Sequence, residues 1–229
     1  MKLTKKIDSV RERIKKAAKK SGRDDSDITL VCVVKEASSE DIVTAVENGR
    51  LFDIGENRIQ DAIARKEAFL GRYDCLRWHF IGHLQSNKAK KAVKLFDLIH
   101  SVDSIELAVE LNRHAEEAKK IQEFLLQVNV SGEDSKFGIS PDRAEEFVKG
   151  LGSLDHVILK GLMTMAPYSD NAEDSRKYFR GLRMLRDRLS RYNKENIDIR
   201  HLSMGMSGDF EIAVEEGADL LRIGSAIFK

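Results

Sequence analysis

The chain has 229 residues, of which 39 are Lys or Arg and 38 are Asp or Glu, so its charges nearly cancel. This balance removes the electrostatic argument for nucleic acid or an anionic membrane as the main partner. Two cysteines, Cys32 and Cys75, provide neither a disulfide framework nor a metal-ligand cluster. No apolar stretch has the length of a membrane span, and the charged amino terminus is not a secretory signal. We therefore expect a soluble, cytoplasmic protein.

Extended and helical patterns alternate along the chain. A basic amphipathic helix over residues 4–20 comes first, because Ile7, Val10 and Ile14 share one face. The apolar runs predicted as strands are 30–34, 51–54, 78–81, 98–102, 124–130, 157–163, 199–203 and 220–223. The helices predicted between them cover 39–48, 57–70, 87–95, 105–120, 141–150, a stretch within 172–191, and 210–216.

Eight strands alternating with helices are the count of a single (β/α)8 TIM barrel, an α/β fold, here with an extra amino-terminal helix. A doubly wound open sheet is the main competitor. It usually has fewer strands, and no Gly-rich dinucleotide fingerprint follows the first strand. With only two prolines and no Gly/Ser-rich linker, we predict one barrel domain over residues 1–229. In such a barrel, functional groups lie at the carboxyl ends of the strands.

Lys35 stands at the carboxyl end of the first apolar run. An amine leaving the packed core there is partly desolvated, so its pKa can fall and it can condense with a carbonyl. The alternative is a lysine whose stem is buried and whose charged head lies in water. The run alone favours this alternative, and the other strand ends favour the reactive amine.

The ends of the last two predicted strands suggest a phosphate site. In barrels, the loops after strands seven and eight often bind phosphate through backbone N–H groups and a helix amino terminus. The Ser203 and Ser225 hydroxyls and the backbone at Gly224 could supply donors, and Arg222 would be a fixed cationic donor near the barrel axis. Two ordinary Gly/Ser turns are the alternative.

These residues resemble the pyridoxal 5′-phosphate (PLP) homeostasis proteins, single-domain barrels similar to the amino-terminal domain of alanine racemase. The resemblance spans residues 1–229. The motifs that carry it, in addition to Lys35, are Gly55-Glu56-Asn57, residues 79–88 (HFIGHLQSNK), Lys136-Phe137-Gly138, residues 161–167 (GLMTMAP), residues 203–209 (SMGMSGD) and residues 222–228 (RIGSAIF).

The resemblance implies a cofactor and the residues that bind it. Lys35 would form the internal aldimine with PLP, and Asn57 would line the cofactor. Phosphate-binding groups fall on Ser203, Gly224 and Ser225, and Arg222 would face the pyridine nitrogen. The chain departs from the family pattern at three further positions: Glu36, Arg58 and Lys229.

A PLP carrier or regulator is favoured over an amino-acid racemase, and no residue is assigned a catalytic role. An arginine facing the pyridine nitrogen cannot act as an acid, so the ring stays a weak electron sink. The racemases resembled here take a second base from a tyrosine across a dimer interface, with a second domain, whereas this chain stops five residues after Gly224. We expect a monomer, with PLP-dependent apoenzymes as recipients.

Other interpretations have less support. His79 and His83 have the i, i+4 spacing that suits zinc on a helix, but they flank a strand end and lack a third ligand. Lys136 could contact an anionic ligand or be a solvated loop charge. A barrel that binds another phosphorylated metabolite is a further alternative.

Overall fold

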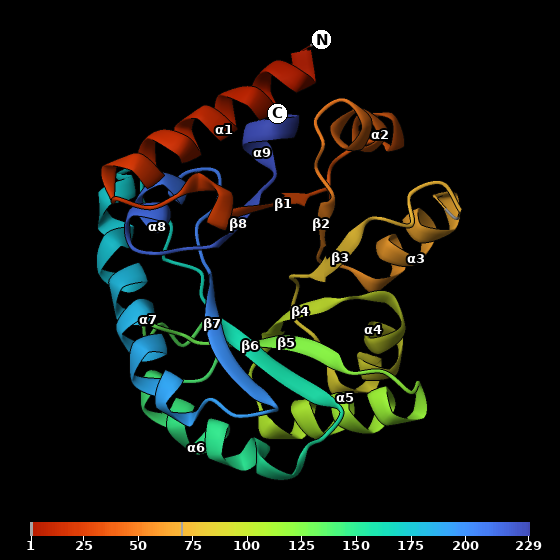
Figure 1. Cartoon of the computed structure of the whole chain (residues 1–229), viewed down its shortest axis with the longest axis vertical. Helices are drawn as coiled ribbons and strands as arrows, with labels where there is room; N and C mark the ends of the chain where they lie inside the picture. Colours follow the sequence, from red (N-terminus) through yellow and green to blue (C-terminus); the bar gives the residue numbers. More distant parts are fainter. Residues whose placement is uncertain (1, 70) are drawn as a thin grey trace.

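Eight parallel strands close into a barrel in the computed structural model of the chain, which describes residues 2–69 and 71–229. The strands follow one another in sequence order, and the last pairs with the first (Figure 1). Their bounds are β1 Thr29–Val33, β2 Asp53–Glu56, β3 Arg77–Phe80, β4 Leu98–Val102, β5 Gln122–Gln127, β6 Val157–Met163, β7 Ile197–Ser203 and β8 Leu220–Ile223. This confirms the predicted TIM barrel.

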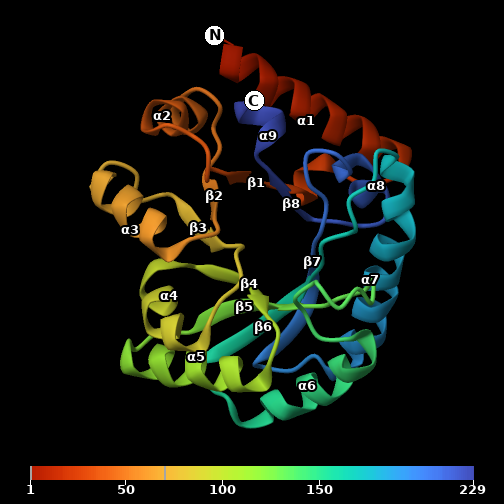
Figure 2. The same ribbon diagram turned by 180° about the vertical axis from the view of Figure 1, so that it is seen from behind.

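Helices surround the barrel and connect successive strands (Figures 1 and 2). Their bounds are α1 Lys2–Lys20, α2 Ser39–Glu47, α3 Ile59–Ala68, α4 Ala89–Leu95, α5 Ile105–Glu117, α6 Ala144–Gly150, α7 Arg176–Leu189, α8 Phe210–Glu215 and α9 Ser225–Phe228. The helix predicted over 57–70 begins at Ile59, and its predicted last residue, Leu70, lies outside the described residues. The short α9 has no counterpart among the predicted elements.

The extra amino-terminal helix, α1, packs on the side of the barrel against α2, α8 and α9 (Figure 1). The face that the sequence predicted as apolar is buried, with Ile7, Val10 and Ile14 inside. At its edge the Arg13 guanidinium donates two hydrogen bonds to the Glu211 carboxylate on α8, at 2.7 and 3.0 Å. The helix is therefore fixed by one apolar stripe and a bidentate ion pair.

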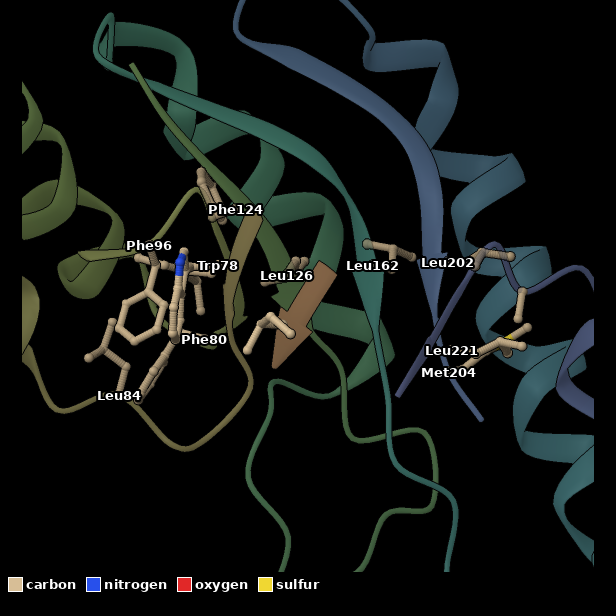
Figure 3. Packing of buried hydrophobic residues seen from close by; sticks show 14 of the residues in the cluster. Trp78, Phe80, Leu84, Phe96, Phe124, Leu126, Leu162, Leu202, Met204 and Leu221 are labelled. Atoms are coloured by element: carbon tan, nitrogen blue, oxygen red, sulfur yellow. The ribbon is translucent and has the colours of Figure 1, made fainter. Parts of the chain in front are cut away.

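Side chains alternate between the two faces of each strand, because successive residues of a strand point to opposite sides. Trp78 and Phe80 of β3 join the large hydrophobic core that includes residues of the surrounding helices, and Figure 3 shows them gathered with Leu84 and Phe96. A second, smaller cluster inside the barrel consists of Leu98, Leu125, Met163 and Leu220. The residues between those of the outer core, such as His79 of β3, therefore face the barrel interior.

Within residues 2–69 and 71–229, no helix is both long and apolar enough to cross a membrane. Cys32 is buried in β1, and burial raises the pKa of its thiol to about 12. Cys75 is exposed. A thiol held protonated in this way does not act as a nucleophile.

Candidate functional site

A cavity of about 580 Å³ opens at the carboxyl ends of the strands. Residues from β1, β8 and the loops after β2, β3, β7 and β8 converge on it, as the barrel predicts. Five of the six predicted binding residues are among those that line it: Lys35, Asn57, Arg222, Gly224 and Ser225. A volume of this size is typical of a small-molecule site.

Lys35 lies on the cavity wall, two residues after β1 ends. Its side chain is 51% exposed, so half of it is buried and half is open to solvent. Its ammonium nitrogen lies 3.9 Å from the Glu36 carboxylate, which is also 2.8 Å from the ammonium of Lys229. The hydrogen bond from Lys229 lowers the pKa of Glu36. At this point the cavity wall therefore presents the accessible Lys35 amine beside the Glu36 carboxylate, whose charge is balanced by Lys229.

Asn57 directly follows β2 and has an unmet hydrogen-bonding capacity. Its Oδ1 atom is buried and has no hydrogen-bond partner among the described residues. The loop after β3 packs tightly against the Asn57 backbone, since a Cβ atom on Gly82 would overlap the Asn57 backbone carbonyl oxygen. A buried acceptor without a partner is costly, and a ligand that donates to it removes that cost.

Arg222 forms the cavity floor. Its buried guanidinium donates from Nη1 to the Ser203 hydroxyl at 2.6 Å and from Nη2 to the Thr164 carbonyl at 2.8 Å. Burial lowers the pKa of Arg222 to about 10, partly offset by attraction to Asp209. The group therefore remains protonated at neutral pH and can only donate hydrogen bonds.

Ser203, the sixth predicted residue, is not among the residues that line the cavity. It is fully buried, and its hydroxyl lies between Arg222 and the Nδ1 atom of His100, 2.8 Å away. Ser207 and Gly208, from the same loop, line the cavity instead. The sequence contained this signal in the SMGMSGD motif, but which of the two serines faces the cavity depends on where β7 ends.

The loops after β7 and β8 form one continuous surface beside Lys35. The Ser207 hydroxyl accepts a hydrogen bond from the backbone N–H of Ala226 at 3.1 Å, which ties the loop after β7 to the first turn of α9. A Cβ atom on Gly208 would meet nothing within 4 Å, whereas one on Gly224 would lie 3.1 Å from the Val33 carbonyl oxygen. The polar groups of this surface are therefore the Ser207 and Ser225 hydroxyls and the backbone at Gly208 and Gly224.

The mouth of the cavity is aromatic and apolar. The rings of His83 and Phe137 stack with their centroids 3.9 Å apart, and the partly exposed Met165 and Met206 line the same cavity. Nδ1 of His83 lies 3.9 Å from the Asp103 carboxylate. Burial raises the pKa of Asp103. These side chains can cover one face of a flat ligand.

The other sequence interpretations fare differently. His79 lies inside the barrel whereas His83 lines the cavity, and no group of three or more His, Cys, Asp or Glu in the described part of the chain could hold a metal ion. The Lys136 amine is buried without a hydrogen-bond partner among the described residues, 3.6 Å from the Glu133 carboxylate. It does not line the cavity.

Comparison with known proteins defines the class first. Residues 6–229 match the family model described as alanine racemase, N-terminal domain. An alanine racemase structure from Clostridium difficile superposes with a TM-score of 0.73 at 16% identity, covering 94% of this chain and 57% of that one. At this identity the likeness shows the shared barrel fold only.

Nearer relatives define the family within this class. A pyridoxal phosphate homeostasis protein of Aquifex aeolicus is 43% identical over 97% of this chain and 95% of its own length. The structure of PipY from Synechococcus elongatus, which has PLP bound, superposes with a TM-score of 0.86 at 33% identity, covering 99% of this chain and all of that one. The chain belongs to the family of pyridoxal phosphate homeostasis proteins, which confirms the resemblance found in the sequence.

Proposed function

We propose that this protein binds PLP in the cavity at the carboxyl ends of the strands and acts in PLP homeostasis without robust catalytic turnover. One observation carries the proposal: an accessible lysine amine, a fixed cation and a hydrogen-bonding surface of two loops meet in one cavity of about 580 Å³. Membership in a family whose named members are PLP homeostasis proteins supports it.

The residues of the cavity fit the functional groups of PLP. When bound, PLP supplies an aldehyde that condenses with an amine, and a phosphate dianion. Lys35 is the accessible amine beside the cavity. Ser207, Ser225 and the backbone at Gly208 would bind the phosphate, and the unpartnered Asn57 Oδ1 could accept a hydrogen bond. Arg222 would donate to the pyridine nitrogen from the floor.

The same floor argues against robust turnover. Arg222 stays protonated and only donates, so it would leave the pyridine nitrogen of bound PLP unprotonated and the ring a weak electron sink. Racemisation needs acid/base groups on both faces of the substrate, yet none of the four tyrosines lines the cavity. The lysines that line the cavity are Lys35 and Lys229, of which Lys229 pairs with Glu36, and no tyrosine is present there as a second base. A monomeric state, a cytoplasmic location and delivery of PLP to apoenzymes are further parts of the proposal.

An absorption spectrum tests the binding. Purified protein mixed with PLP should gain the visible band of PLP bound covalently to an amine, and Lys35→Ala should lack it. Lys90→Ala is the matched control, because Lys90 is an exposed lysine that does not line the cavity. A wild-type protein without the band would overturn the proposal. If another phosphate ester then raises the melting temperature, the barrel binds that metabolite class instead.

Chiral chromatography tests the absence of turnover. L-Alanine and other L-amino acids incubated with the PLP-bound protein should remain L. Accumulation of the D-enantiomer that disappears in Lys35→Ala would show a racemase.

A further inference from the structure

A line of polar side chains crosses the barrel interior below the cavity floor. His79 of β3 lies 2.9 Å through Nε2 from the Asp53 carboxylate of β2, and 2.9 Å through Nδ1 from Nε2 of His100 on β4. His100 in turn lies 2.8 Å through Nδ1 from the Ser203 hydroxyl, which accepts from Arg222. Four hydrogen bonds therefore connect Asp53 to Arg222 without a break.

The two ends of this line lie at opposite faces of the barrel. Arg222 lines the cavity at the carboxyl face. Asp53 is the first residue of β2, is 24% exposed, and borders a smaller hollow with Arg11 and Arg50 on the amino-terminal side. His79, His100 and Ser203 between them are fully buried. The hydrogen bonds thus run from a partly exposed carboxylate through buried side chains to the cavity floor.

Two neutral rings and an ionised Asp53 set the direction of every hydrogen bond. The Asp53 carboxylate can only accept, so His79 donates to it from Nε2. Because a neutral ring carries one proton, Nδ1 of His79 then accepts from Nε2 of His100, and Nδ1 of His100 accepts from the Ser203 hydroxyl. The Ser203 oxygen in turn accepts from Arg222, which can only donate. Each ring therefore carries its proton on Nε2.

The interior favours this arrangement over a charged one. Burial lowers the pKa of His79 and lowers that of His100 well below its ordinary value, and both imidazoles stay neutral. A second proton on His100 would make Nδ1 a donor, so that the Ser203 oxygen would face two donors and its own hydrogen would lose its acceptor. An unsatisfied polar group costs more in this interior than at the surface.

We propose that Asp53 is a positioning residue for the cofactor cavity. It orients Arg222 through the hydrogen bonds of His79, His100 and Ser203. Ser203 accordingly serves to orient Arg222 and does not bind phosphate. The four hydrogen bonds from Asp53 to Arg222, called the relay below, keep one guanidinium N–H of Arg222 on Ser203. This fixes the plane of the guanidinium and hence the direction in which its other N–H groups point toward the ligand. Where it concerns PLP, this inference rests on the proposed function; the hydrogen-bond directions do not.

Nitrogen-15 NMR of the histidine rings tests the directions on the protein without PLP. Long-range correlation spectra distinguish a protonated ring nitrogen from a bare one. His79 and His100 should both carry the proton on Nε2 at neutral pH. A proton on Nδ1 of either ring, or a doubly protonated ring, would overturn the relay. This measurement uses the wild-type chain and therefore does not depend on a variant that folds.

Titration with PLP tests whether the far end matters to the cavity. Asp53→Leu removes the last acceptor, and we expect the Kd for PLP to rise about threefold with a shifted absorption maximum. Ser203→Ala, one bond from Arg222, should raise the Kd about tenfold, because a hydrogen bond to a charged group is lost. Asp53→Asn keeps an acceptor oxygen and should restore both properties to within about twofold of wild type.

Asp25→Leu is the matched control, since Asp25 borders the same hollow, is exposed and is not part of the relay. Asp53→Leu with the affinity and absorption maximum of Asp25→Leu would overturn the positioning role. If the wild-type protein gains no PLP band, the proposed function fails, and the NMR result still decides the relay.

Discussion

Lys35 and Arg222 border the same cavity but are held in opposite ways. The Lys35 side chain is half exposed and lies 3.9 Å from a single carboxylate, on a turn between β1 and α2. Arg222 is buried and donates two hydrogen bonds within the barrel, one of which begins a relay through the interior. The amine that would react is left accessible, whereas the cation that would only orient the ligand is fixed.

This difference predicts where the protein tolerates change. A side chain that must move to react gains little from rigid contacts, so its removal costs little stability. A buried charge is stable only with its partners in place, so breaking such contacts is costly. Substitutions at exposed and at buried positions should therefore differ in their effect on stability.

Arg65→Leu should have the largest effect. Arg65 pairs with Glu56, which is fully buried, and donates to the Ala37 carbonyl at 3.3 Å in the segment that follows Lys35. Its loss leaves a buried carboxylate without a cation, at a cost of about 3 kcal/mol in the free energy of unfolding. Urea denaturation measures this, with Arg65→Lys, which keeps the charge, as the milder control. Equal stability of the wild type and the Leu variant would refute the role given to Arg65.

Gly82→Ala should destabilise by about 2 kcal/mol, because the new methyl group would overlap the Asn57 carbonyl oxygen and force two loops apart. The Kd for PLP should rise with it, since Asn57 would move. Gly208→Ala is the stability control: its Cβ atom meets nothing within 4 Å. The two variants compared by thermal denaturation should differ clearly, and similar melting temperatures would contradict the close packing at Gly82.

The buried histidines should make stability depend on pH. Burial lowers the pKa of His79 and His100 from the ordinary value of 6.5, so the folded state binds fewer protons than the unfolded state in mildly acidic solution. Their contribution is therefore complete above about pH 6.5 and is lost as the pH falls below it. Urea denaturation at several pH values should show this decrease, with a shallower slope in His100→Gln. An unchanged slope in that variant would argue against a buried neutral His100.

Lys35→Ala should have the smallest effect on the protein without PLP. The side chain is half exposed, so the free energy of unfolding should change by less than about 0.5 kcal/mol. Thermal denaturation without PLP measures it. A larger loss would show that Lys35 also supports the fold and would weaken the contrast with Arg222.

Much of the barrel follows from local patterns. The ranges of β4, β6 and β8 agree with the predicted ones at both ends, because each strand begins and ends on an apolar residue that is flanked by a polar residue or a glycine. The second strand was predicted at 51–54 but covers Asp53–Glu56. Leu51 is buried without belonging to a strand. Glu56 is a buried carboxylate at the end of β2, and Arg65 on α3 compensates its charge. The local sequence around residue 53 does not show that Glu56 has this partner.

The sequence predicts which residues line the cavity where their position depends only on a strand end. It does not predict the orientation of a side chain that depends on hydrogen-bond partners far away in the chain. Lys35, Asn57, Arg222, Gly224 and Ser225 reach the cavity because the topology places the ends of their strands there. Ser203 turned inward because His100, 103 residues away, and Arg222 both bond to its hydroxyl. The two histidines of the relay stand in apolar runs that indicate strands without showing their partners.

The single tryptophan of the chain gives the barrel an intrinsic optical probe. Trp78 is 5% exposed, lies in β3 next to His79, and is the one indole in the sequence. PLP bound to an amine absorbs light in the range where tryptophan emits, so a filled cavity should quench this fluorescence by energy transfer. The release of the cofactor to an acceptor could then be followed in real time from an unlabelled protein.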